Sequence, residues 1–386
     1  MIETHPLGDV GVAVLDCEHK TPPEADAGYP YIAIPDIQDG RIDISASRRV
    51  SRAHLEEWTK RTRPVPGDLV VTRRGRVGDS APIPVDRCAI GQNLVILRSD
   101  GKQVDQRFLR WACRSPLWWR EVDRFRNVGA VFSSLNVRDI SRMSIPVPSL
   151  AVQGRIAEVL GALDDKIAAN RRVVAAAREL GISLMRASAL EPLPLSEIAK
   201  VTMGTSPKGE LLNEGGAGLP FFQGVRDFGP VYPNERIYTE HPVRTARAGS
   251  VLFAVRAPVG KTNLALGETA IGRGLAGIHS ADQPATLYFA MKAFESIWDE
   301  FDGSGTVFAS VNASQVRSAV LPMPAVSEAR TCEGQLAPLL ERMVAAERES
   351  ERLAATRDEL LPLLMSGKIT VKDAEREIES DAGQEV

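Results

Sequence analysis

A short glycine-flanked loop, present once in each half of the chain, carries the side chains best suited to bind a polyanion. The first copy reads Gly67-Asp-Leu-Val-Val-Thr-Arg-Arg-Gly-Arg-Val-Gly78 and places Arg73, Arg74 and Arg76 after an apolar run. Guanidinium groups neutralise phosphates and can donate two parallel hydrogen bonds to guanine O6 and N7. Glycine lets the backbone approach a duplex closely. The loop therefore predicts contact with DNA, and the alternative is an ordinary solvated surface loop.

The second copy of this loop is also basic. It reads Gly249-Ser-Val-Leu-Phe-Ala-Val-Arg-Ala-Pro-Val-Gly260 and supplies Arg256, with Lys261 directly after it. Because both copies carry basic residues, we favour a DNA contact over a solvated loop. The other side chains predicted to contact DNA are Arg48, Arg49, Arg52, Lys208, Arg226 and Arg273. Arg120, Arg124 and Arg126 could also lie beside a duplex, whereas Trp118 and Trp119 are predicted to belong to the core.

No residue pattern in the chain points to catalysis or to a bound metal ion. The four cysteines share no metal-ligand spacing, and the five histidines do not cluster with them. Gly260-Lys-Thr262 is a fragment of a phosphate loop whose first glycine is replaced by Val255. Asp164, Asp165 and Lys166 are predicted to be surface charge on the flank of a helix. We expect a protein that is not an enzyme, with no catalytic residues and no metal.

Composition is that of an ordinary globular protein. The 386 residues are enough for two or more domains, and the formal net charge is −3. The acidity is concentrated after residue 320, so that the first half is modestly basic and compatible with a phosphate-bearing partner. No apolar run approaches the length of a membrane span, and no signal peptide precedes the first domain, so we expect a cytoplasmic protein.

Further repeats show that the two halves of the chain are copies of one unit. Gly129-Ala-Val-Phe-Ser-Ser-Leu-Asn136 matches Gly305-Thr-Val-Phe-Ala-Ser-Val-Asn312, and Ile145-Pro-Val-Pro148 matches Leu321-Pro-Met-Pro324. The matched segments occur in the same order in both halves. Two copies in one chain predict a pseudo-two-fold arrangement that reads a partner with two halves.

Each copy is followed by a segment with heptad spacing. Apolar residues recur at alternating steps of four and three, which predicts two long helices that pack along a common seam, most simply antiparallel. Asn170 and Arg357 are polar seam residues that could fix the register, or could face solvent. Pro338 marks the point where the regular part of the second helix could begin. The predicted seam consists of Ile156, Leu160, Leu163, Ile167, Asn170, Val174, Leu339, Met343, Leu353, Arg357, Leu360 and Leu364.

These elements give a predicted domain plan. A first mixed domain covers 1–148 and includes a helix at about 103–120, and a second mixed domain covers 191–324. The helices cover 149–190 and 325–370, and the acidic residues 371–386 are predicted to be a disordered tail. The predicted fold class is α/β (α+β): two recognition domains in a pseudo-two-fold arrangement, separated by two long antiparallel coiled-coil helices.

The chain resembles the specificity (S) subunit of a type I restriction–modification system over about 1–370. The resemblance rests on Ile145-Pro-Val-Pro-Ser149 with Gln153 and Ile156, on Leu160-Gly-Ala-Leu-Asp-Asp-Lys-Ile167, and on Leu364-Met-Ser-Gly-Lys-Ile369. The repeated glycine-flanked loop and Arg357-Asp-Glu-Leu-Leu361 are also similar to that family. The second helix departs from the pattern, because Ala329 and Cys332 stand where a Gln-x-x-Ile start is usual.

The resemblance implies a role without catalysis. Each recognition domain would read one half of a bipartite, asymmetric sequence in double-stranded DNA, and the helices would set the gap between the halves. The helices would also dock two methyltransferase (modification) subunits, which use S-adenosylmethionine to methylate adenine N6. Restriction motor-nuclease subunits, which use ATP and Mg²⁺, would complete the complex. This chain would bind none of these cofactors itself and would not contact a membrane.

Three alternatives stay open at the level of sequence. The chain could be a recognition or scaffold subunit of another bacterial defence system that reuses these domains. It could be a protein-interaction scaffold without a DNA role, although the repeated basic loop speaks against this. It could also be an enzyme with an unfamiliar site, such as a solitary nuclease.

Overall fold

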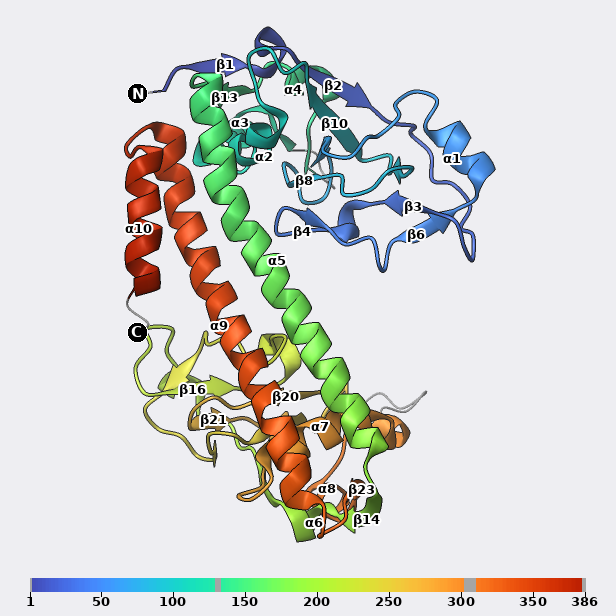
Figure 1. Ribbon diagram of the computed structural model, residues 1–386, viewed down its shortest axis with the longest axis vertical. Coiled ribbons are helices and arrows are strands. Elements are labelled where there is room, and N and C mark those ends of the chain that lie inside the picture. Colours follow the sequence, from blue (N-terminus) through green and yellow to red (C-terminus); the bar gives the residue numbers. More distant parts are fainter. Residues whose placement is uncertain (1, 129–132, 302–309, 384–386) are drawn as a thin grey trace. The chain divides into compact units, whose positions relative to one another are not determined.

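The protein is represented by a computed structural model that describes residues 2–128, 133–301 and 310–383. It divides into two compact units: unit 1 comprises Met1–Asp165 and Leu353–Val386, and unit 2 comprises Lys166–Arg352. In each unit, short strands and helices pack against parts of two long helices, α5 (Leu150–Ala187) and α9 (Ala329–Ser366) (Figure 1). The predicted motifs Gly129–Asn136 and Gly305–Asn312 lie partly outside the described residues.

Unit 1 is built on a four-stranded antiparallel sheet with two buried faces. The strand order is β2 (Val12–Asp16), β10 (Leu94–Ser99), β7 (Leu69–Thr72), β8 (Ser80–Pro82). Because side chains alternate along a strand, Leu69 and Val71 face one core and Val70 faces another. The apolar runs Leu69–Val71 and Leu94–Leu97 thus lie on the two central strands of the sheet.

Smaller elements cover the two faces of this sheet. One face packs against α2 (Gln106–Ala112), α3 (Pro116–Phe125) and the long helices. The other face packs against residues of β3, β9 and the β4–β5 segment. The remaining elements of unit 1 are β1 (Thr4–Pro6), β3 (Tyr29–Ile32), β4 (Ile37–Gln38), β5 (Arg41–Ile42), β6 (Arg48–Val50), β9 (Ala89–Ile90), β11 (Asn127–Val128), β12 (Ser133–Ser134), β13 (Ser144–Pro146), α1 (Arg52–Trp58) and α4 (Val137–Ile140).

Unit 2 repeats this topology with its own side chains. Its main antiparallel sheet has the order β15 (Lys200–Met203), β22 (Leu275–His279), β19 (Val251–Ala254), β20 (Thr262–Leu264). In both units a parallel pair lies beside the main sheet: β3 with β9 in unit 1, and β16 with β21 in unit 2. The other elements of unit 2 are β14 (Leu190–Pro194), β16 (Leu219–Phe222), β17 (Tyr238–Thr239), β18 (Thr245–Ala246), β21 (Thr269–Ile271), β23 (Val320–Pro324), α6 (Leu195–Ile198), α7 (Pro284–Ala293) and α8 (Ala313–Ser318).

The two long helices are antiparallel within each unit. In unit 1, Ile156, Leu160 and Leu163 from the start of α5 share a core with Leu360 and Leu364 from the end of α9. In unit 2, Val174 and Ala177 share a core with Met343 and Ala346. The predicted fold class, mixed α/β units with two long antiparallel helices, is confirmed. The predicted domain limits stay predictions, since the two structural units divide both helices.

Two of the predicted seam residues, Leu339 and Leu353, are only half-buried and pack against the cores of unit 2 and unit 1 respectively. Leu336 and Leu340 are more deeply buried than Leu339. The predicted break at Pro338 is wrong. α9 continues through Pro338, whose ring is exposed. Leu336 before it and Leu340 after it are both buried, which anchors the helix on each side of the proline.

The expected disordered tail is wrong as well. Residues 371–383 form α10 (Val371–Gly383), which begins after Gly367 takes a left-handed conformation with φ of 71°. Val371 and Ala374 are buried in the core of unit 1, and Ile378 packs against that core. Apolar residues at this spacing form one helical stripe, which the acidic composition of the segment obscured.

Two expectations about the region around the tryptophans also need correction. The helix expected at 103–120 is two helices, α2 and α3, separated where Ser115 caps the second one by accepting from the Trp118 N–H. Trp118 is fully buried and its indole N–H donates to the Gly78 carbonyl at 2.9 Å, as expected of a core residue. Trp119 is 39% exposed, so its assignment to the core was wrong.

Candidate nucleic-acid interface

The repeated basic loop of unit 1 is held between two neighbouring segments. It follows β7, and the Arg73 N–H donates to the Asn93 carbonyl at 2.8 Å in the turn between β9 and β10. On its other side, the Leu135 N–H donates to the Arg73 carbonyl at 2.9 Å, and Arg74 pairs with Ser134 as an isolated antiparallel bridge. The loop is therefore fixed rather than free to extend from the sheet.

The loop of unit 2 is held in the same way. The Val255 N–H donates to the Gly274 carbonyl at 3.0 Å, and the Val311 N–H donates to the Val255 carbonyl at 3.0 Å. Arg256 pairs with Ser310 as an isolated antiparallel bridge. In each unit the fold thus brings together the two repeated motifs that are far apart in the chain. Arg74 and Arg256 occupy equivalent positions beside equivalent serines.

The three arginines of the first loop have different roles. The half-buried Arg73 side chain donates to the Leu135 and Gln92 carbonyls, both at 3.4 Å. Arg76 donates to the Ile34 carbonyl at 2.8 Å and forms an ion pair with Asp79 at 3.3 Å. The Arg74 side chain is exposed and contacts no polar group among the described residues. Arg74 is therefore the side chain of this loop best placed to meet an external phosphate or base.

In unit 2, four of the predicted residues lie on segments that meet at one end of the strands of the main sheet. We call Lys208, Arg226, Arg256 and Arg273 the basic edge of unit 2. Arg273 is tied to the segment before Lys208, because its N–H donates to the Ser206 hydroxyl at 3.3 Å. All four side chains are exposed, and among the described residues only Lys208 has a side-chain ion pair, a surface contact with Glu210 at 3.8 Å.

Close backbone packing requires glycine at this edge. A Cβ added to Gly274 would lie 2.2 Å from the carbonyl oxygen of Gln223, in the segment that leads to Arg226. A Cβ added to Gly204 would lie 2.1 Å from the carbonyl oxygen of Gly272. Since no side chain fits in either place, these glycines allow the loops that carry the basic residues to meet.

Most of the other predicted basic residues are engaged within the protein. Lys261 forms an ion pair with Glu295 at 2.5 Å, and Arg52 forms one with Glu56 at 2.9 Å along α1. Arg48 pairs with Glu24 at 3.3 Å, while Arg49 donates to the Ile44 carbonyl at 3.1 Å. Arg124 and Arg126 pair with Glu121 and Asp123, at 3.4 and 3.2 Å respectively. Exposed pairs of this kind exchange readily, so they weaken these predictions without contradicting them.

The surface position expected for Asp164 is wrong, because its side chain is fully buried at the centre of an arginine cluster. Its carboxylate contacts Arg110 and accepts from Arg357 Nη1 at 2.6 Å, and it lies 3.7 Å from Arg41 and 3.9 Å from Arg114. Burial alone would raise the pKa of Asp164, but Arg110 and Arg357 outweigh it and hold the pKa below its usual value. The heptad spacing gave no sign of this contact.

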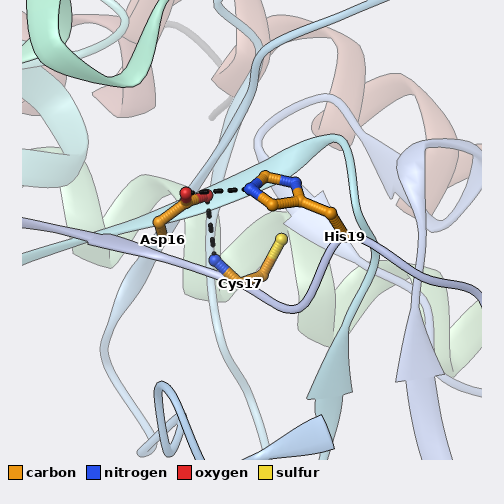
Figure 2. Close-up of side chains that lie close together, drawn as sticks. All are labelled: Asp16, Cys17 and His19. Atoms are coloured by element: carbon orange, nitrogen blue, oxygen red, sulfur yellow. Dashed lines mark hydrogen bonds and ion pairs between the residues drawn. The ribbon is translucent and has the colours of Figure 1, made fainter.

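Asp16, Cys17 and His19 lie close enough together to share a cation, at the end of β2 (Figure 2). Other contacts already engage these groups. Asp16 pairs with Arg61 at 3.1 Å and with His19 at 3.0 Å, and the Cys17 thiol donates to the Gly91 carbonyl at 3.1 Å. Burial, together with Asp16, raises the pKa of Cys17 to about 11, which disfavours the thiolate that a metal would bind. The group fits a structural contact with the Gly91 turn better than a metal site.

Comparison with known proteins agrees with this architecture. Residues 3–176 match the family described as Type I restriction modification DNA specificity domain. A chain of Methanocaldococcus jannaschii named as a type I restriction enzyme MjaX specificity subunit is 26% identical over an alignment of 378 positions, which covers 89% of this chain and 88% of that one. The chain is thus similar to type I specificity subunits over most of its length. The resemblance drawn from the sequence is supported by these matches.

A solved structure of a specificity subunit shares the fold. The S subunit of the type I system of M. genitalium aligns with a TM-score of 0.63 at 14% identity, covering 95% of this chain and 96% of that chain. The HsdS subunit of Thermoanaerobacter tengcongensis is 24% identical over 95% of this chain and 97% of that chain, with a TM-score of 0.36. Among the described helices, none has the length and apolar character needed to span a membrane.

Proposed function

We propose that each unit of this specificity subunit reads one half of a bipartite, asymmetric target in double-stranded DNA. The observation that carries the proposal is the equivalence of Arg74 and Arg256. Each is exposed in a repeated loop, and each is fixed by its neighbours rather than by its own side chain. A fixed backbone with a free guanidinium suits DNA recognition. Because the loop backbone is already ordered, less conformational entropy is lost on binding than for a flexible loop.

The two units would read different sequences because their basic surfaces differ. Unit 2 presents the four residues of its basic edge, whereas unit 1 presents Arg74 with the exposed Arg120. Phosphate contacts would supply affinity and register, and groove contacts would supply the sequence preference. Binding should therefore weaken steeply as salt is raised.

The long helices would set the gap between the half-sites and dock two methyltransferase subunits. The specificity subunit itself would be non-catalytic. Its methyltransferase partners would use S-adenosylmethionine for adenine-N6 methylation, and motor-nuclease partners would use ATP and Mg²⁺ in restriction. Similarity to type I specificity subunits supports these partners and a place in the cytoplasm beside the DNA.

The test is to co-express the chain with the methyltransferase encoded beside it and to map N6-methyladenine across the host genome by single-molecule sequencing. We expect one split, asymmetric motif with a modified adenine on each strand. A stable complex that methylates no motif would contradict the proposed function. Failure to form any complex would contradict the proposed partners.

A further inference from the structure

The cluster around Asp164 joins four separate elements of unit 1. Asp164 lies on α5, Arg357 on α9, Arg110 on α2 and Arg41 on β5, and Arg114 follows α2. Arg41 also donates to the Asp164 backbone carbonyl. One carboxylate thus connects both long helices to the recognition fold of the unit.

Several features show that this cluster requires a specific geometry and does not serve stability alone. Asp164 is fully buried, and the side chains of Arg357, Arg114 and Arg110 are only 10, 16 and 18% exposed. Arg110 Nε and Arg114 Nη1 are buried without a hydrogen-bond partner among the described residues. Among the described residues, Asp358 also pairs with the cluster, at 2.7 Å from Arg357, and is largely exposed, while Asp39 acts on Arg114 electrostatically. Buried ionic clusters of this kind often add little stability but tolerate few geometries.

In unit 2, the positions equivalent to Asp164 and Arg357 carry no charge. The repeated motifs place Pro322 at the position equivalent to Pro146, an offset of 176 residues. With this offset, Leu340 is equivalent to Asp164, and Gly181 is equivalent to Arg357. Leu340 is buried, and Gly181 packs so tightly that an added Cβ would lie 2.2 Å from the Phe289 ring. Since a packed apolar contact serves in unit 2, stability alone does not explain the ionic cluster in unit 1.

We propose that Asp164 is a positioning residue, which holds the recognition fold of unit 1 on the two long helices at a single register. Coupling to Arg357 fixes α9 along α5, and coupling to Arg110 and Arg114 fixes α2 against both helices. A shift of one helical turn would leave a buried carboxylate unpaired, whereas apolar residues alone would tolerate such a shift. The proposal deepens the proposed function, on which it rests for the link to DNA spacing.

Helix register can be measured in the full-length chain by crosslinking. Asn170 Nδ2 donates to Glu349 Oε2 at 2.8 Å, so cysteines at these two positions should be joined by a short bis-maleimide. A second pair, Asn170→Cys with Ala345→Cys, reports a shift of one turn. The four native cysteines are buried and should react slowly. We expect the 170–349 product to exceed the 170–345 product at least about tenfold in the unaltered background, as a single register requires.

Two variants and one control then test Asp164. Asp164→Asn removes the charge but keeps the shape. The combined variant Asp164→Leu, Arg110→Leu, Arg114→Met and Arg357→Met replaces the cluster by apolar residues and should still fold. The control is Asp68→Asn, which breaks another buried ion pair of unit 1, with Arg98 at 2.6 Å, without touching the long helices.

We expect the apolar variant to keep its unfolding temperature but to lose register preference, with a product ratio near roughly 1–3. A ratio that stays about tenfold in the apolar variant would overturn the proposal, as would an equal loss in the Asp68→Asn control. Mapping the methylated motif separates this proposal from the proposed function. If register becomes mixed but the gap between half-sites stays fixed, Asp164 still positions the helices and the spacing role of the helices is wrong.

Discussion

At the scale of single residues, the structure distinguishes arginines that support the fold from arginines that are free to bind. Arg73 and Arg76 bind backbone carbonyls of unit 1, whereas Arg74 is exposed between them. Of the three basic residues that are clustered in the sequence, only Arg74 is therefore well placed to contact DNA. Arg256 is its counterpart in unit 2.

Charge reversal at Arg74 should weaken DNA binding without unfolding the chain. For Arg74→Glu in the assembled complex, we expect about a tenfold loss of affinity and a salt-dependence slope smaller by about one, as for one lost phosphate contact. The measurement is a binding isotherm over a salt series, with Lys102→Glu as control, because Lys102 is exposed and follows β10 at the end far from this loop. Equal slopes for Arg74→Glu and the control would remove this loop from the interface. Arg73→Glu should instead lower the unfolding temperature.

Lys292 should make unit 2 more stable as the pH rises. Its ammonium is largely buried and donates to the Thr262 carbonyl at 2.8 Å, and burial, with Arg178 nearby, lowers its pKa to about 8. Between pH 8 and the unfolded value near 10.5, the unfolded chain binds more protons than the native chain, so stability increases with pH in that window.

The corresponding measurement is urea unfolding of the natural chain and of Lys292→Met between pH 7 and pH 10. The natural chain should gain stability relative to the variant by up to about 1 kcal/mol per pH unit above pH 8. Identical pH profiles for the two chains would show that Lys292 titrates normally in the native state.

At the scale of elements, each long helix caps a helix of its own recognition fold. In unit 1, Gln153 of α5 is fully buried and its Oε1 accepts from the Asp105 N–H, at the start of α2. In unit 2, Glu333 of α9 accepts from the Ala285 and Thr286 N–H groups at the start of α7, at 3.0 and 2.8 Å. Ala329 is equivalent to Gln153 but cannot accept a hydrogen bond through its side chain. Glu333, one turn later, accepts the hydrogen bonds at the helix start instead.

Removing this cap should destabilise unit 2. For Glu333→Ala we expect a loss of roughly 1–3 kcal/mol, because two helix N–H groups and the Thr286 hydroxyl lose their acceptor. Glu333→Gln should recover part of it, since the amide oxygen still accepts. Thermal unfolding measures both variants, and equal unfolding temperatures for alanine and glutamine would show that the hydrogen bonds are unimportant.

Helix α10 should contribute to the stability of unit 1. Deletion of residues 371–386 exposes the surface that Val371 and Ala374 cover, and should cost roughly 2–4 kcal/mol at typical values for buried apolar side chains. Calorimetry of the truncated chain gives the measurement. An unchanged transition would mean that α10 is not docked in solution, whereas substitution of the exposed Glu375 provides a control that should be neutral.

At the scale of the whole molecule, the proposed function makes the two recognition folds separable. Exchange of residues 1–145 for the matching domain of another family member should change one half of the methylated motif and leave the other half and the gap unchanged. Each unit has its own sheet and core, which makes such an exchange structurally reasonable. Methylome sequencing provides the readout, and altered bases in both halves would refute independent reading.

The sequence by itself determined the repeat, the two long helices and the family resemblance, because these depend on local order and periodicity. Strands such as β7 and β10 alternate apolar residues between two cores, and heptad spacing extends over many turns, so both signals are present within short windows. The basic loops were also visible, because the glycines and arginines that form each loop are close together in the sequence.

Only the tertiary structure decided what each charged residue does. Asp164 looks like surface charge until four arginines from other elements surround it, and Arg73 looks like a DNA ligand until the Leu135 and Gln92 carbonyls bind it. The acidic stretch after Gly367 looks disordered until its apolar stripe meets the core of unit 1. The reason is physical: a charge is assigned its role by the partners and burial that distant segments provide, and no local spacing records them.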